Sequence, residues 1–251
     1  MSPVALVTGG GRGIGRATAQ LLAERSMTVV AVSRTDADLR ALASIAPVDT
    51  IVGSVETEDS CTSIVSEVER RHGGIDVLVN NAGIDTGEEL EVWRQDPQLW
   101  HQSMAVNLDA AFHLTRLASS GMVERGWGRI VMVSSTAGEV GGPRMTAYCA
   151  SKHGLLGLMR AAAHDLAPHG VTCNAVCPGW VRTPMSERTA EREAKQQSLT
   201  IDQIWAQRNA ESPAGRIVTA EEVAETIAFL AGDGASGING EAVTISLGSA
   251  W

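Results

Sequence analysis

Short apolar runs rich in β-branched residues alternate with longer helical patterns along this chain of 251 residues. The apolar runs lie at residues 4–7, 28–32, 50–52, 77–80, 129–134, 171–176 and 242–245. They are continuous, which is typical of strands buried on both faces in a parallel sheet. Helical patterns lie between them at residues 14–26, 57–72, 105–125, 147–169 and 219–231, and a further helix begins at Thr35 with Asp38 as its capping partner. The alternation predicts one α/β domain over residues 1–251, with right-handed βαβ units and a doubly wound parallel sheet.

One segment, residues 184–213, interrupts this alternation between a strand and the next helix. It is rich in helix-forming and charged residues, so it could be a solvated helical excursion. Ligand crevices of doubly wound sheets lie outside the carboxyl ends of the strands, and this segment follows such an end. We therefore expect residues 184–213 to form a lid over a substrate site.

The charge balance excludes several kinds of partner. The net charge is −9, which disfavours nucleic acid and anionic membrane surfaces. No apolar run approaches the roughly 20 residues of a membrane-spanning helix, and the first residues resemble a strand more than a leader peptide. Four cysteines without a CxxC pair and scattered histidines favour a cytoplasmic protein that holds no metal.

A glycine-rich turn, TGGGRGIG at residues 8–15, follows the first predicted strand and opens a helix. Glycines allow a tight turn and let the backbone approach a pyrophosphate, and a helix N-terminus attracts anions. We expect a dinucleotide to bind here, at Gly9, Gly11, Arg12, Gly13, Ile14 and Gly15.

Arg34, preceded by Ser33, lies nineteen residues after Gly15. An NAD site commonly has an acidic residue near this distance, which binds the 2′-hydroxyl of the ribose. Arginine instead matches a 2′-phosphate bidentately, and Arg12 offers a second cation. The pattern predicts NADP(H), with NAD(H) as the alternative if Arg34 is only a solvated surface charge.

The only tyrosine of the chain, Tyr148, stands four residues before Lys152 on a predicted helix. Positions i and i+4 share a helix face, so the ammonium is expected beside the phenol. A neighbouring cation lowers the pKa of a phenol and brings it into range for acid–base chemistry. Ser135 ends a predicted strand thirteen residues before Tyr148.

Taken together, these motifs resemble the short-chain dehydrogenase/reductase family, which has a Rossmann-like fold. The resemblance covers essentially the whole chain and includes NNAG at residues 80–83, AVNL at 105–108 and PGWVRTP at 178–184. The stretch NAVCPG at 174–179 is similar to acyl and polyketide ketoreductases and to 3-hydroxyacid dehydrogenases of that family.

The resemblance implies a catalytic set of four residues. Tyr148 would exchange a proton with the substrate oxygen, and Lys152 would lower its pKa and bind the nicotinamide ribose. Ser135 would hydrogen-bond the carbonyl, and Asn107 would anchor a water that links Lys152 to solvent. Further cofactor contacts are implied for Asn81, Ala82, Gly83, Pro178, Gly179, Val181 and Thr183. Family analogy also suggests a homotetramer that assembles through the helices at 105–125 and 147–169.

Two positions depart from the family pattern. Ser54-Val55 stands where the family commonly has Asp-Val beside the adenine. Ser246-Leu247-Gly248 stands where it often has Asp-Gly-Gly, near the subunit contacts of family tetramers.

These observations predict an oxidoreductase that interconverts a ketone and a secondary alcohol with NADP(H). The expected wall of the substrate pocket is Thr136, Ala137, Val140, Met145, Trp180, Met185 and Trp205. Arg144 could pair with a substrate anion or be a surface residue. The alternatives are an NAD-dependent hydroxyacid or alcohol dehydrogenase, and a non-catalytic regulatory protein that senses NADP(H). A sugar-nucleotide epimerase is disfavoured because the chain is too short for the added substrate domain.

Overall fold

A computed structural model describes residues 2–87 and 90–249. Seven parallel strands form one sheet in the order β3-β2-β1-β4-β5-β6-β7. The strands are β1 Val4–Thr8, β2 Thr28–Ser33, β3 Val48–Val52, β4 Val77–Asn80, β5 Gly128–Val133, β6 Val171–Pro178 and β7 Ala242–Ile245. The helices are α1 Gly13–Glu24, α2 Asp36–Ala43, α3 Glu58–His72, α4 Pro97–Met104, α5 Ala110–Arg125, α6 Thr146–Leu166, α7 Pro184–Gln197, α8 Ile201–Ala210 and α9 Ala220–Leu230. The predicted doubly wound, Rossmann-like parallel sheet is therefore confirmed.

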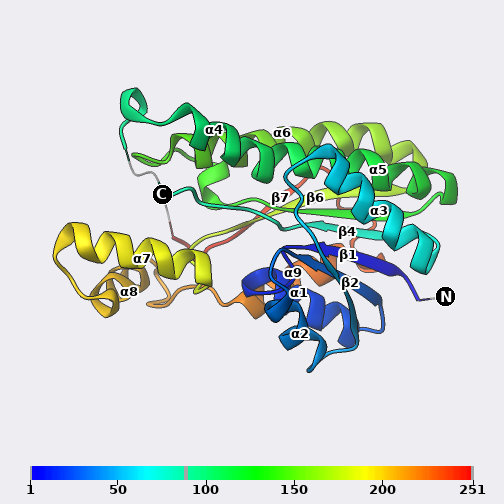
Figure 1. Ribbon diagram of the computed structural model, residues 1–251, viewed down its shortest axis with the longest axis horizontal. Coiled ribbons are helices and arrows are strands. Elements are labelled where there is room, and N and C mark those ends of the chain that lie inside the picture. The colour runs from blue at the N-terminus through cyan, green and yellow to red at the C-terminus, as the bar shows by residue number, and fades with distance from the viewer. Residues whose placement is uncertain (1, 88–89, 250–251) are drawn as a thin grey trace.

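Helices cover both faces of this sheet (Figure 1). Helices α3, α5 and α6 lie on one face, and α1, α2 and α9 lie on the other. Successive strand residues point to opposite faces, so Leu6 joins the first core while Ala5 and Val7 join the second. The continuous apolar runs of the sequence thus supply two cores from the same strands.

The order of the strands reverses at β1, which pairs with β2 on one side and with β4 on the other. Parallel sheets bind ligands outside the carboxyl ends of their strands at such a reversal. The loops after β1 and β4 meet there.

The helix expected over residues 105–125 is present, but it is not a regular α-helix over its whole length. A π-turn, η2 Ala105–Asp109, separates α4 from α5. Asn107 explains the interruption, because its side chain bonds the backbone of Ile84 across the molecule, with Oδ1 accepting from N (2.8 Å) and Nδ2 donating to O (3.0 Å). Single π-turns inside helices are frequent at functional sites.

The expected cap of α2 is also absent. Thr35 is the N-cap residue but its side chain makes no capping bond. Asp38 instead lies with Oδ2 3.9 Å from Arg12 Nη1 of the glycine-rich turn. The ion pair of Asp38 with Arg12 therefore replaces the expected capping contact with Thr35.

Residues 184–213 form helices α7 and α8, which project from the carboxyl end of the sheet (Figure 1). They share a small core of Ala190, Ala194, Ile204 and Trp205. Both helices begin with a complete capping box, at Thr183 and Thr200. None of the helices in the described ranges is long and apolar enough to cross a membrane.

Candidate active site

The glycine-rich turn packs closely against its surroundings at the start of α1. Gly13 has a φ of +55°, and a Cβ there would lie 3.1 Å from Thr183 Cγ2 at the start of α7. A Cβ at Gly15 would lie only 2.3 Å from the carbonyl oxygen of Gly9. Both positions therefore require glycine, one for its conformation and the other for close packing.

Asn81, directly after β4, ties the glycine-rich turn to the neighbouring strand. Its Nδ2 donates to the carbonyl oxygens of Thr8 (2.7 Å) and Gly9 (3.3 Å). The hydroxyl of Thr8 accepts in return from the backbone N of Asn81 and of Ala82, at 3.0 Å each. This hydrogen-bond network fixes the glycine-rich turn at the point where the strand order of the sheet reverses.

Arg34 lies at the carboxyl end of β2 and lines the same cavity as the glycine-rich turn. Within residues 2–87 and 90–249 no carboxylate forms an ion pair with it. Arg12 also lines the cavity, beside Asp38. The part of the cavity beside the glycine-rich turn therefore presents a guanidinium group that is available to an anion.

Tyr148 and Lys152 lie one turn apart on α6, as their spacing predicts. Lys152 Nζ lies 5.7 Å from the centroid of the Tyr148 ring and donates to the carbonyl oxygen of Val133 at 2.8 Å. Ser135, just after β5, lies within hydrogen-bonding reach of the phenol. Its Oγ also accepts from the backbone N of Ala137 (3.1 Å), which orients it. The three side chains meet at one wall of the cavity.

The expected direction of the Tyr148 pKa is wrong for this structure. Burial raises the pKa of Tyr148 to about 12, and the hydrogen bond with Ser135 opposes this only in part. Burial lowers the pKa of Lys152 to about 8. Removing each group from water penalises its charged form, which raises the pKa of the phenol and lowers that of the ammonium. The phenol is therefore protonated at neutral pH.

Asn107 lies behind this wall. Besides Ile84, its Nδ2 contacts Ser151 Oγ at 3.1 Å and Ser103 Oγ at 3.3 Å. A Cβ at Gly83 would lie 3.4 Å from Asn107 Oδ1 and 3.5 Å from Lys152 Nζ. Asn107 and Lys152 thus approach each other across Gly83, although Asn107 does not line the cavity.

A cavity of about 870 Å³ joins the glycine-rich turn to Tyr148. Most of the residues expected from the sequence line it. They are Gly9, Arg12, Gly13, Ile14, Ser33, Arg34, Asn81, Ala82, Gly83, Ser135, Thr136, Ala137, Met145, Tyr148, Lys152, Pro178, Gly179, Trp180, Val181, Thr183 and Met185. The expected residues that do not line it are Gly11, Gly15, Asn107, Val140 and Trp205.

Gly11 and Gly15 lie below the surface of the turn. A Cβ at Gly11 would lie 2.9 Å from the Cβ of Asp38, so Gly11 allows the turn to pack on α2. Trp205 is 5% exposed and packs between α7 and α8, where its Nε1 donates to Glu187 Oε2 at 3.0 Å. Its position in the inserted segment predicts a place in the pocket wall, but the side chain lies in the core of that segment instead.

The sequence interpretation missed a polar part of the wall. One face of α7 and the segment after β4 contribute it, through Asp85, Thr86, Gln95, Arg188, Thr189, Glu193, Gln196 and Gln197. The residues from α7 fall at positions 188/189, 193 and 196/197, so they follow the helical period. That spacing was a usable signal, but the sequence does not say which face of α7 turns inward.

Asp85 connects this wall to α7. Its carboxylate forms an ion pair with Arg192, and Thr189 Oγ1 donates to Asp85 Oδ2 at 3.4 Å. Among the described residues no group of three His, Cys, Asp or Glu side chains is arranged to hold a metal ion.

Comparisons with known proteins agree with this geometry. The sequence model described as short chain dehydrogenase matches residues 3–194. A protein of Streptomyces virginiae described as a ketoacyl reductase of monensin polyketide synthase is 40% identical, over 97% of this chain and 95% of its own. A D-beta-hydroxybutyrate dehydrogenase of Cupriavidus necator is 37% identical, over 94% of this chain and 93% of its own.

The fold comparison points the same way. The crystal structure of an actinorhodin polyketide ketoreductase with NADPH superposes with a TM-score of 0.93 at 35% identity. The match covers 99% of this chain and 98% of that one.

Proposed function

Because this chain belongs to the short chain dehydrogenase family, we propose that it reduces a ketone to a secondary alcohol with NADPH. The observation that carries the proposal is one cavity that presents Tyr148, Lys152 and Ser135 together with the glycine-rich turn. A protein that only senses a dinucleotide needs the turn but not this proton-transfer set. The intact set therefore favours an enzyme over the regulatory alternative.

The chain's own residues fit NADP(H). Gly13 lines the cavity and its backbone suits a pyrophosphate, and Arg34, which has no ion pair among the described residues, offers a guanidinium to a 2′-phosphate. An NAD-dependent dehydrogenase would be expected to place a carboxylate there instead. Lys152 is positioned to bind the nicotinamide ribose, and Val181 and Thr183 the carboxamide. When bound, the cofactor supplies the hydride.

Tyr148 acts as the proton donor in the reduction. Its raised pKa keeps the phenol protonated at neutral pH, as a donor to a forming alkoxide must be. Ser135 holds the carbonyl oxygen beside the phenol, which both orients the ketone and stabilises the charge that develops on its oxygen. Lys152, cationic below pH 8, strengthens this field and helps the phenol release its proton. Asn107 would act as a positioning residue by anchoring a water that links Lys152 to solvent.

The substrate proposed is a 3-oxoacyl compound. The names of the ketoacyl reductase and hydroxybutyrate dehydrogenase relatives support this class. The wall combines apolar side chains such as Met145 and Met185 with amide groups such as Gln95. A 3-oxoacyl compound has both characters, with an apolar chain and polar ketone and acyl groups.

Helices α7 and α8 serve as the substrate lid. One face of α7 lines the cavity, and Asp85 ties it to the opposite wall through Arg192. Closure of such a lid would exclude water from the reacting carbonyl.

The proposal includes a homotetramer in the cytoplasm. Phe112 is half-exposed on α5, one of the two helices expected at the subunit contacts. The cysteines in the described ranges are free and buried, which suits a reducing compartment. Light scattering should give four times the chain mass; a monomer at micromolar concentration would contradict the assembly without affecting the chemistry.

The test is turnover across a panel of ketones that includes 3-oxoacyl thioesters and free 3-oxoacids, with NADPH and with NADH. We expect NADPH-dependent reduction of at least one 3-oxoacyl compound and a much lower rate with NADH. A preference for NADH with a free 3-hydroxyacid would favour the dehydrogenase alternative. NADPH binding without turnover of any ketone would favour the regulatory one.

A further inference from the structure

Two tryptophans and two arginines form a stack beside the substrate cavity. The Arg208 Cζ lies 3.7 Å from the ring centroid of Trp180 and 4.7 Å from that of Trp205. The Arg182 Cζ also lies 5.1 Å from the ring centroid of Trp205. The stack thus joins the loop after β6, which carries Trp180, to helix α8.

Arg208 is the most buried cation of this stack, with 2% of its side chain exposed. Its Nη1 donates to the carbonyl oxygen of Ser186 (3.1 Å), and Nη2 lies 3.0 Å from Glu193 Oε2. Both partners are on α7, and both line the cavity. One guanidinium group therefore holds two cavity-lining residues of α7 and one cavity-lining indole.

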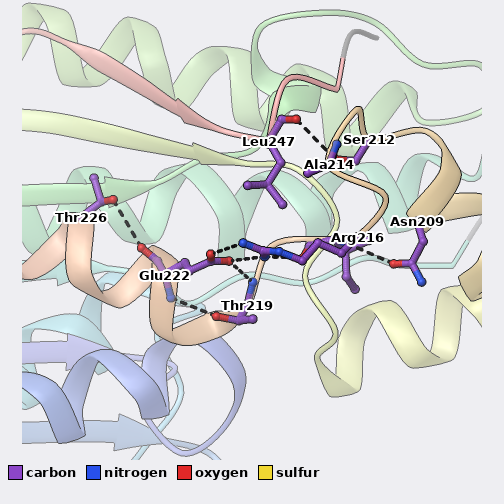
Figure 2. A network of polar contacts seen from close by, with 9 residues as sticks. Asn209, Ser212, Ala214, Arg216, Thr219, Glu222, Thr226 and Leu247 are labelled. Atoms are coloured by element: carbon purple, nitrogen blue, oxygen red, sulfur yellow. Dashed lines mark hydrogen bonds and ion pairs between the residues drawn. The ribbon is translucent and has the colours of Figure 1, made fainter.

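The end of α8 that carries Arg208 is anchored to the body of the protein (Figure 2). Asn209 Oδ1 accepts from the backbone N of Ile217 at 3.1 Å, and Ser212 Oγ donates to the carbonyl oxygen of Leu247 at 3.3 Å. Arg216 forms a bidentate pair with Glu222 at the start of α9. Arg208 thus projects from the end of α8 that these contacts hold in place.

The side chain of Trp180 contacts this anchored end of α8. Its ring lies against the Arg208 guanidinium, and its Nε1 donates to Glu211 Oε2 at 3.0 Å, just past the end of α8. Trp180 also lines the cavity. Two contacts of the indole, with Arg208 and with Glu211, therefore come from the anchored end of α8.

From this arrangement we propose that Arg208 is a positioning residue for substrate selection, which fixes the indole of Trp180 as a rigid wall of the ketone site. The inference rests on the proposed function for its kinetic consequence. Its structural content, that Arg208 sets the position of Trp180, does not depend on turnover.

A structural role alone would not require a cation here. Removing a guanidinium from water is costly, and replacing a buried ion pair with apolar residues of similar volume is often neutral or stabilising. Arg208 Nε moreover has no hydrogen-bond partner among the described residues. What arginine adds over an apolar residue is a flat face for the indole and a charge that fixes Glu193.

The test compares Arg208→Met, which keeps the bulk, with Arg208→Lys, which keeps the charge but loses the flat face. We expect both variants to raise the KM for the ketone about tenfold and to reduce discrimination between short and long 3-oxoacyl chains. The Kd for NADPH should stay within twofold. Lys195→Met, on the exposed outer face of α7, is the matched control and should change neither constant.

A double-mutant cycle with Trp180→Ala distinguishes an effect of Arg208 through Trp180 from a general disturbance of the fold. If Arg208 acts through Trp180, the double variant has the same ketone KM as Trp180→Ala alone. Additive effects, or a loss of NADPH affinity equal to the loss for the ketone, would overturn the inference. Circular dichroism shows whether Arg208→Met folds. If it does not, the cycle is measured with Arg208→Lys.

A direct readout makes the inference independent of activity. In protein labelled with 5-fluorotryptophan, the ¹⁹F resonance of Trp180, identified by its loss in Trp180→Phe, should shift or broaden in both Arg208 variants. The resonance of the exposed Trp93 should not change. An unchanged Trp180 resonance would refute the positioning role even if the wild type is active. If the wild type turns over no ketone, the proposed function fails. The ¹⁹F resonance of Trp180 in the Arg208 variants still tests whether Arg208 positions Trp180.

Discussion

Replacing Arg34 with alanine should convert a strong NADPH preference into a weak one. The guanidinium lines the cavity beside the glycine-rich turn, without an ion pair in the described part of the chain. Hydrogen bonds to a charged group contribute about 1.5–3 kcal/mol, and each 1.4 kcal/mol is a factor of ten. Arg34→Ala should therefore lower kcat/KM for NADPH by about 10- to 150-fold. The value for NADH, which has no 2′-phosphate, should hardly change.

The assay is initial-rate kinetics with both cofactors at a saturating ketone concentration and at two ionic strengths. Arg40→Ala is the matched control, because Arg40 lies on α2 nearby, is 74% exposed and pairs with Asp36 at 2.8 Å. Equal losses with NADPH and NADH would refute the reasoning, since they would mean that Arg34 supports the fold of the site and not the phosphate.

Three further predictions concern Lys152 and Gly15. The rate of reduction should fall as pH rises above about 8, because Lys152 loses its charge there while Tyr148, with a pKa of about 12, keeps its proton; a flat profile from pH 7 to pH 10 would contradict this. By linkage, the unfolded chain binds more protons than the folded one between the folded pKa of Lys152 near 8 and its ordinary value of 10.5. The free energy of unfolding of the wild type, relative to that of Lys152→Met, should thus rise across this window in urea titrations.

Gly15→Ala should lower the free energy of unfolding by about 1–3 kcal/mol and raise the KM for NADPH, because its Cβ would meet Gly9 and Asn81. Gly237→Ala, where a Cβ meets no atom within 4 Å, is the control, and equal stability of the two variants would exclude the packing argument.

The fold could be read from the sequence because its signals are local. Continuous apolar runs mark strands buried on both faces, and Leu6 and Val7 show why, since neighbouring residues of β1 enter opposite cores. The spacing of Tyr148 and Lys152 likewise needs only helix geometry to bring them together. Arg34 could be identified because its distance from the glycine-rich turn follows from the length of one βαβ unit.

What could not be read depends on contacts between distant segments. The π-turn at Asn107 exists because its amide bonds Ile84, twenty-three residues away, and no local pattern indicates this. The raised pKa of Tyr148 comes from burial, which only the folded structure defines. A lone arginine in a polar helix, as Arg208 is, resembles a surface residue until its two tryptophan neighbours are seen.

The most direct test of the account is the reaction of Tyr148→Phe, which removes one hydroxyl from the cavity wall. General acid catalysis contributes roughly 10²–10⁴ in rate, so kcat for ketone reduction should fall by about that factor. The Kd for NADPH, measured by quenching of protein fluorescence, should remain within about twofold, because the glycine-rich turn, Arg34 and Lys152 are unchanged. A variant that binds NADPH normally and reduces the ketone at the wild-type rate would show that the proton comes from elsewhere.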